Sequence, residues 1–182
     1  MFHGTGGSPT HFWFPYLIQS LSKDEFAVTA PQLPNTDNPN IAEWLPFALK
    51  TCVFDKDTIL VGHSAGCPLI LSILENIDTQ INKAILVAGF SQPLGKEPEP
   101  ILQDQYNWSK IKQNSKYFAF INSVNDPWGC NDLQGRIIFD KLGGDLIIRS
   151  DQGHMGSESF NQPYAEFPLV KSLIENKVQQ LK

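Results

Sequence analysis

One stretch of this chain decides its fold: Asp57-Thr58-Ile59-Leu60-Val61-Gly62-His63-Ser64-Ala65-Gly66. Ile59 to Val61 form the short, continuous apolar run of a parallel strand that is covered on both faces, and residues 67–77 continue with the apolar spacing of a helix. A serine between two glycines at such a strand-to-helix turn is typical of a nucleophile elbow, in which a strained backbone lifts the hydroxyl above the sheet. Ser64 is therefore the candidate nucleophile.

Length and composition indicate one globular domain. The chain has 182 residues, enough for a domain that buries about 70% of its unfolded surface. Hydrophobic residues make up 41% and charged residues 18%, as in a soluble protein, and no apolar run reaches the roughly 18 residues that a membrane span needs. The net charge is −5, and Lys and Arg do not cluster, which argues against nucleic acid or an anionic membrane as a partner. We expect a single domain over residues 1–182.

The cysteines indicate a reducing compartment. Cys52, Cys67 and Cys130 are an odd number, and their spacing matches no zinc pattern. We therefore expect core thiols, no metal and a cytoplasmic location. His3 and Gly4 already belong to the first loop of the fold, so we expect no secretory signal ahead of it.

Strands and helices are expected to alternate along the chain. At most Met1 and Phe2 belong to a first strand, and apolar runs predict further strands at residues 26–30, 59–61, 83–90, 116–123 and 145–149. Helical spacing predicts helices at residues 10–21, 67–77, 131–142 and 168–181, with another that opens at 38–39, carries apolar residues from 41 to 52 and contains Pro46. Residues 91–115 are expected to form a loop with one short helix at most. Alternation without hairpin signals favours an α/β fold, a doubly wound, mostly parallel sheet with helices on both faces.

A serine hydroxyl needs a histidine to accept its proton and an acid to orient that histidine. Of the four histidines only His154 follows Ser64, in a Gly-rich loop after the last predicted strand, and ligands bind at that end of a doubly wound sheet. The acid is expected after a strand between Ser64 and His154. Asp126, whose conformation the next residue Pro127 restricts, is the first choice, and Asp151 is the alternative. The order Ser, Asp, His is that of the α/β-hydrolases.

Two backbone N–H groups are needed to bind the oxyanion that forms on the attacked carbonyl. Ala65, directly after the nucleophile, is expected to supply one of them. Thr5 in the glycine-rich loop after the first strand is expected to supply the other, with Gly6 as the alternative. The same loop could hold a phosphate or dinucleotide, but it lacks the third glycine of that motif and has Pro9 instead, so we expect no cofactor.

The motifs named above occur together, in order and over essentially the whole chain, with His11-Phe12-Trp13-Phe14-Pro15-Tyr16-Leu17 at the first helix and Asn125-Asp126-Pro127 before Gly153-His154. In this the chain resembles the small serine-hydrolase family of the retinoblastoma-binding protein 9 hydrolase and bacterial YdeN-like proteins. The resemblance implies an α/β-hydrolase core of about six strands without an N-terminal hairpin, and a triad at Ser64, Asp126 and His154. The motif tied to retinoblastoma-protein binding is absent here, so that partner is not expected.

These residues predict an esterase-type serine hydrolase that cleaves a small ester, thioester or amide through an acyl-enzyme on Ser64. His11 and Trp13 are candidates for lining the site, unless they cap and pack the first helix, and Trp128 is a candidate for its mouth. His63 is expected to be a packed neighbour of the elbow. The alternative is a binding module that keeps the fold without the activity, since a fold does not guarantee a function.

Overall fold

The centre of the molecule is a sheet of four parallel strands. The computed structural model describes residues 1–24 and 26–176, and in this part of the chain the strands lie side by side in sequence order. Their bounds are β1 (Ile59–His63), β2 (Lys83–Val87), β3 (Phe118–Ser123) and β4 (Asp145–Arg149). Every residue of β2 and β3 is buried, as the continuous apolar runs of these segments predict for strands that helices cover on both faces.

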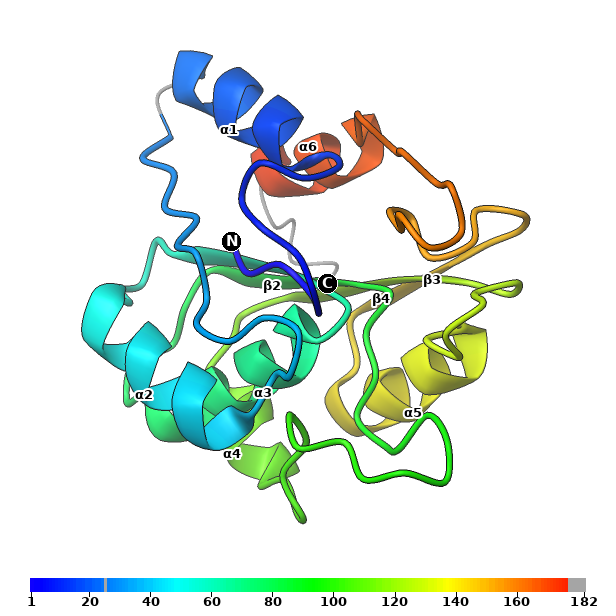
Figure 1. Ribbon diagram of the computed structural model, residues 1–182. Coiled ribbons are helices and arrows are strands. Elements are labelled where there is room, and N and C mark those ends of the chain that lie inside the picture. The colour runs from blue at the N-terminus through cyan, green and yellow to red at the C-terminus, as the bar shows by residue number, and fades with distance from the viewer. Residues whose placement is uncertain (25, 177–182) are drawn as a thin grey trace.

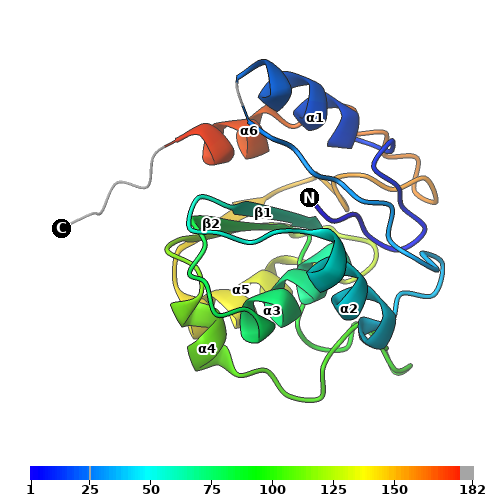
Figure 2. The same cartoon turned by 90° about the vertical axis from the view of Figure 1, so that its left-hand side faces the viewer.

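Helices cover both faces of the sheet (Figure 1, Figure 2). One face carries α2 to α5 and the other carries α1 and α6. The bounds are α1 (Phe14–Lys23), α2 (Ile41–Thr51), α3 (Gly66–Asn76), α4 (Trp108–Gln113), α5 (Asp132–Leu142) and α6 (Pro168–Glu175). None of the helices in the described residues is long and apolar enough to cross a membrane. The predicted α/β fold is confirmed.

The predicted number of strands, about six, is wrong for the part of the chain that the structure describes. Phe2 makes an isolated parallel bridge to Gly62, at the outer edge of β1, instead of a strand. Residues 26–30 form no strand either, although the Met1 amino group donates a hydrogen bond to Thr29 O (2.7 Å). A strand needs a neighbour that offers a ladder of hydrogen bonds, and two residues before the first turn do not offer one.

The helix boundaries differ from the prediction, most clearly at the start of α1. α1 begins at Phe14 and not at Thr10, because Phe12 has a φ of +52°, a left-handed conformation that an α-helix does not include. α2 begins at Ile41, a little after the predicted opening at residues 38–39, and Pro46 lies inside it. The helix predicted for residues 168–181 is described as far as Glu175, and its last six predicted positions fall at the edge of the described residues or outside them.

Lys83 fastens α6 to the sheet. Its Nζ donates to the carbonyl oxygens of Leu173 (2.7 Å) and Ile174 (2.9 Å), and also to that of Asn176. The last carbonyls of a helix lack partners within the helix, and a buried ammonium group needs acceptors, so each satisfies the other. Burial lowers the pKa of Lys83. This contact ties the C-terminal helix to the first residue of β2.

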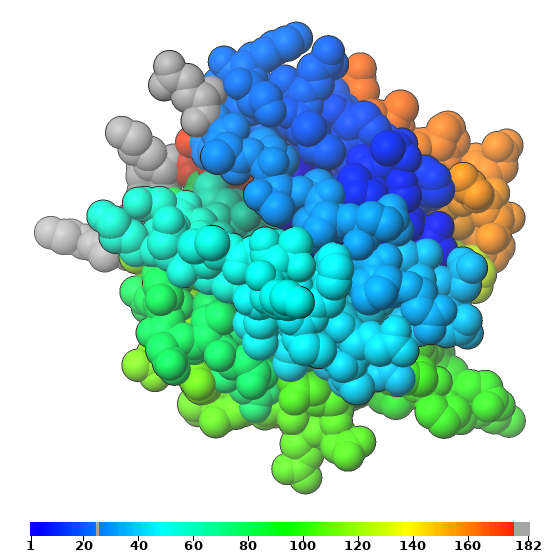
Figure 3. Space-filling view, turned by 60° about the vertical axis from the view of Figure 1, so that its left-hand side comes forward, coloured from blue at the N-terminus to red at the C-terminus, as the bar shows by residue number. Residues whose placement is uncertain are grey.

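The N-terminal segment and the segment that follows β4 meet over the carboxyl ends of the strands. Trp13 is fully buried, and its Nε1–H donates to Met155 O (2.9 Å). Figure 3 shows the N-terminal segment (blue) beside the segment that follows β4 (orange).

The three cysteines are free thiols, as predicted. Cys67 and Cys130 are buried, and Cys52 is half-buried.

Candidate active site

Ser64 lies in the sharp turn between β1 and α3. Its φ of +52° falls in the left-handed region, which residues with a side chain rarely adopt, and its N–H donates to Val87 O on the neighbouring strand (2.9 Å). Ser64 is 9% exposed. The predicted order of strand, strained serine and helix is therefore present around this residue.

Gly62 and Gly66, the two glycines of the elbow, lie where other backbone segments approach closely. A Cβ atom added to Gly62 would lie 2.8 Å from Gly66 O, and one added to Gly66 would lie 2.3 Å from Phe2 O. Both distances are shorter than a Cβ atom tolerates, so glycine is required at these positions for strand and helix to approach.

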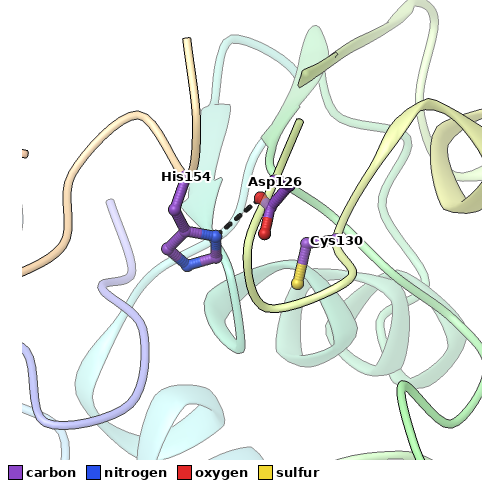
Figure 4. Close-up of side chains that lie close together, drawn as sticks. All are labelled: Asp126, Cys130 and His154. Carbon is purple, nitrogen blue, oxygen red and sulfur yellow. Dashed lines mark hydrogen bonds and ion pairs between the residues drawn. The ribbon is translucent and has the colours of Figure 1, made fainter. Parts of the chain in front are cut away.

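His154 and Asp126 form a buried hydrogen-bonded pair. His154 Nδ1 lies 2.7 Å from Asp126 Oδ2, and the two side chains are 7% and 0% exposed (Figure 4). Asp126 Oδ1 accepts a second hydrogen bond, from the Trp128 N–H (2.8 Å). The carboxylate thus holds the ring in one orientation with Nδ1 protonated. Asp151, the alternative acid of the sequence analysis, is exposed instead.

Side chains from other segments hold the backbone on either side of His154. Asn125 Oδ1 accepts from the Gly153 N–H (2.9 Å), and Gln162 Oε1 accepts from the His154 N–H (2.7 Å). The Met155 carbonyl accepts from Trp13, as described above. The loop that carries His154 is therefore fixed through its backbone as well as through its imidazole ring.

His63 joins the elbow to this loop. Its Nε2 lies 2.9 Å from the backbone carbonyl of His154, and because a carbonyl only accepts, Nε2 carries the hydrogen. The two imidazole rings are 4.9 Å apart between centroids. Burial lowers the pKa of His63 to about 3, and the nearby His154 adds to this effect. The ring is therefore a neutral donor at neutral pH.

A cavity of about 490 Å³ lies above Ser64 and His154. Of the residues predicted for oxyanion or substrate binding, Thr5, His11 and Trp128 line it. Trp13 is not among the lining residues; its buried indole instead donates to Met155 O in the His154 loop. Ala65, the residue after Ser64 in the chain, is buried. The rest of the wall includes Gly4, Gly6, Phe12, Asp37, Phe90, Leu94, Glu99, Ile101, Cys130, Ser157 and Glu158.

Asp126, Cys130 and His154 bring three types of metal-binding group together, with one ligand atom from each within 4.8 Å of the others (Figure 4). The residue types suit zinc. However, two ligands at about 2.0–2.1 Å from a tetrahedral zinc ion are about 3.3 Å apart, whereas His154 Nδ1 and Asp126 Oδ2 are 2.7 Å apart. A metal ion would have to break this hydrogen bond. The observed arrangement is that of an acid–histidine pair.

Three residues of this site did not stand out in the sequence. Asn125 is part of a motif, but the motif does not indicate its role as an acceptor for the His154 loop, although an Asn at a turn often binds backbone N–H groups in this way. Gln162 lies eight residues beyond His154, in a segment without a motif. Cys130 looked like an ordinary core thiol. Long-range contacts of this kind leave no periodic signal in a single sequence.

Fold and site together define a class of protein. A parallel sheet between helices, with a strained serine at a strand-to-helix turn and a histidine–aspartate pair at the carboxyl ends of the strands, is the architecture of the α/β-hydrolases. Within this class, the model of the Serine hydrolase family matches residues 1–175, and the chain belongs to that family.

Relatives of known sequence or structure agree with this assignment. YdeN of Bacillus subtilis (strain 168) is 33% identical over 129 residues, which are 68% of each chain. Serine hydrolase RBBP9 of Rattus norvegicus is 27% identical over 164 residues, or 88% of this chain and 87% of the relative. The crystal structure of the B. subtilis ydeN gene product matches with a TM-score of 0.84 at 26% identity, covering 95% of this chain and 94% of that chain. The resemblance inferred from the motifs is thereby confirmed.

Proposed function

We propose that this protein hydrolyses small esters, thioesters or amides through an acyl-enzyme on Ser64. The observation that carries the proposal is the 2.7 Å hydrogen bond between His154 and Asp126, both buried, at a cavity that the strained Ser64 also lines. Without this pair a serine hydroxyl is too weak a nucleophile at neutral pH.

In the proposed reaction His154 Nε2 takes the proton of Ser64 Oγ as that oxygen attacks the substrate carbonyl. Asp126 keeps Nδ1 protonated and stabilises the imidazolium that forms. His154 then gives the proton to the leaving group as the carbonyl–leaving-group bond breaks. A water molecule, activated by the same nitrogen, attacks the acyl-enzyme, and the acid product leaves with Ser64 restored.

The oxyanion is proposed to bind to the backbone N–H groups of Ala65 and Thr5. Gly4 supports this placement, because a Cβ atom added to it would lie 2.7 Å from Ser64 Cβ, so the loop passes directly beside the nucleophile. The alternative donor, Gly6, already gives its N–H to Thr36 O (2.8 Å). Thr5 is therefore the better candidate in this loop.

Cys130 is a second nucleophile type at the same cavity, and its protonation argues against a role in attack. Burial raises the pKa of the Cys130 thiol well above its usual value, and the nearby Asp126 carboxylate adds to this effect. A thiol attacks as the thiolate, so this cysteine is a poor nucleophile where it stands. Ser64, with its histidine, is the group that we propose reacts.

Labelling with a fluorophosphonate probe tests the proposal. The probe phosphonylates a serine that a histidine activates, so we expect labelling of the wild-type protein and none of Ser64→Ala. Ser159→Ala, a change at another serine of the cavity wall, is the matched control and should label normally. Folded wild-type protein that does not react would favour the binding module, and labelling that survives in Ser64→Ala would assign the chemistry to another residue.

A further inference from the structure

Within the part of the chain that the structure describes, the outer edge of β4 is open. β4 is the last strand of the sheet and pairs with β3 over its whole length. No other segment of the described residues pairs with its far side. Ile148 on this strand is 47% exposed, which is unusual for a large apolar side chain in a sheet. An open edge is a template for pairing with another strand.

The hydrogen bonds to β3 show which backbone groups of β4 are free. Arg149 O accepts from the Val124 N–H at the end of β3 (2.9 Å), so the backbone groups of Arg149 face β3. Backbone direction alternates along a strand, and therefore Ile147 and Asp145 face β3 as well. The N–H and carbonyl groups of Leu146 and Ile148 face outward.

The sequence of β4, Asp145-Leu146-Ile147-Ile148-Arg149, is complementary to itself when two copies run antiparallel. With Ile147 opposite its own copy, Asp145 faces Arg149 of the second copy at both ends, and Leu146 faces Ile148 of the second copy. The two residues with outward backbone groups are then opposite each other, as a hydrogen-bonded antiparallel pair requires. Charge and backbone direction therefore select the same register.

Neighbouring registers lack this agreement. One strand can shift along the other and still bring the outward N–H and carbonyl groups of both copies face to face. Such a shift places Asp145 opposite Ile147 of the second copy, or, in the other direction, Ile147 opposite Arg149. Each shift sets a charge against an apolar side chain and removes both ion pairs. The Asp145 carboxylate is also held in place, since it accepts a hydrogen bond from the Tyr117 hydroxyl.

We propose that β4 pairs with β4 of a second copy of this chain about a two-fold axis at Ile147. The result is a continuous sheet of eight strands, four from each copy, with an Asp145–Arg149 ion pair on either side of the axis. A self-complementary patch of this kind closes into a dimer and does not propagate. Because a single five-residue strand from each copy forms the contact, the dimer depends on protein concentration.

A short strand with a charge at each end also resembles an edge that is protected against pairing. The ladder between β3 and β4, however, runs without a bulge over five consecutive pairs, and β4 contains no Pro or Lys that would block a partner. Experiment separates the two interpretations.

Sedimentation velocity from about 1 to about 500 µM protein, a range that covers weak interfaces, provides the test. We expect dimers at the upper end. Arg149→Asp and Asp145→Arg each place like charges opposite one another twice, so each should raise the dissociation constant about tenfold or more. The double change Asp145→Arg with Arg149→Asp restores the opposite charges and should restore the dimer. A wild-type protein that stays monomeric throughout, or a double variant no better than the single ones, overturns the proposal.

Disulfide trapping checks the register itself. In the proposed dimer Ile147 lies opposite its own copy in a non-hydrogen-bonded pair, where side chains are closest, so Ile147→Cys should form a covalent dimer on mild oxidation. Ile148→Cys is the matched control, because its own copy lies two residues further along the partner strand. Equal trapping of the two variants, or trapping of Ile148→Cys alone, contradicts the register. Neither measurement depends on Ser64, so a failure here leaves the proposed hydrolase activity untouched.

Discussion

At the scale of single residues, the site depends on how His154 is held. Its ring bonds to Asp126 and its backbone carbonyl bonds to His63, the residue directly before Ser64. The first contact sets the tautomer of the ring, and the second sets the distance between its loop and the elbow.

The contact with Asp126 has a large predicted effect on the rate. Asp126→Asn should lower kcat on the order of 10⁴-fold, because an amide in place of the carboxylate leaves His154 in the wrong tautomer. Asp151→Asn, at an exposed position in the same loop, is the matched control and should cost far less. Steady-state kinetics with an activated ester measures both. The reverse order of effects would mean that the orienting acid is Asp151.

The contact with His63 should act on kcat with little effect on KM, since His63 positions His154. His63→Phe keeps an aromatic ring but loses the donor, and we expect kcat to fall about 10- to 100-fold. His63→Gln keeps an N–H at a similar reach and should recover most of this loss. If Phe and Gln at this position gave the same kcat, the hydrogen bond would have no part in catalysis.

His63 also links stability to pH. Its pKa is about 3 in the folded protein because of burial, against about 6.5 in the unfolded chain. Below pH about 6.5 the unfolded chain binds a proton that the folded protein does not bind until pH about 3. The free energy of unfolding therefore falls as the pH is lowered through this window, by at most about 1.4 kcal/mol per pH unit from this group.

Urea unfolding at several pH values between about 7 and 4 measures this slope. His63→Gln lacks the titrating group, so its stability should depend less steeply on pH than that of the wild-type protein. His3, whose pKa burial also lowers, keeps part of the dependence in both proteins. Identical slopes would show that His63 is accessible to protons in the folded state.

At the scale of helices and strands, the elements that local sequence patterns determine were predicted from the sequence. The bounds of β4 agree with the predicted ones, and the turn at Ser64 has the predicted strand and helix on either side. Apolar runs and glycine spacing determine these elements through residues close together in the chain. A single sequence therefore contains the information needed to predict them.

The misses have a different physical origin. Residues 26–30 have the apolar pattern of a strand, but whether they form one depends on a neighbouring strand far away in the sequence. The anchoring of α6 by Lys83 and the support of His154 by Gln162 also join distant segments. Such contacts arise from the tertiary fold, and local propensity does not encode them.

Gly66, the first residue of α3, tests how tightly strand and helix are packed at the elbow. Gly66→Ala places a Cβ atom 2.3 Å from Phe2 O, so backbone must move, and we expect a loss of about 1–3 kcal/mol in the free energy of unfolding. Gly95→Ala is the matched control, because an added Cβ there meets nothing within 4 Å. Denaturant unfolding measures both. A Gly66→Ala protein as stable as the control would mean that the crossing of the two segments is looser than described.

At the scale of the whole molecule, the connection between β2 and β3 leaves the site without a lid domain. Residues 88–117 contain one helix, the short α4, and otherwise loop apart from an isolated bridge between Ser115 and Ile81. Leu94 and Ile101 from this loop line the wall of the cavity, whose volume of about 490 Å³ suits a modest substrate.

The cavity therefore predicts a preference for short acyl groups. Each methylene group contributes about 0.8 kcal/mol to binding only while the cavity covers it. We expect the highest kcat/KM for aryl esters with acyl groups from acetate to hexanoate, and no jump in rate when a lipid interface forms. The series from acetate to palmitate, assayed below and above the critical micelle concentration, tests this. A rate that kept rising to palmitate would require a tunnel or a mobile cover.

The contacts around Ser64 and His154 also bear on when the proposed activity can arise during synthesis of the chain. Gly4 lies beside Ser64, Trp13 and His63 donate hydrogen bonds to carbonyls of the loop that carries His154, and Gln162 accepts one from the His154 N–H. A ribosome-bound chain that has not yet released residue 162 lacks one of these supports, and Trp13 reaches Met155 only once the chain folds. If Ser64 reacts as we propose, unfinished chains should lack this chemistry, and the appearance of probe labelling should mark the completion of folding on the ribosome.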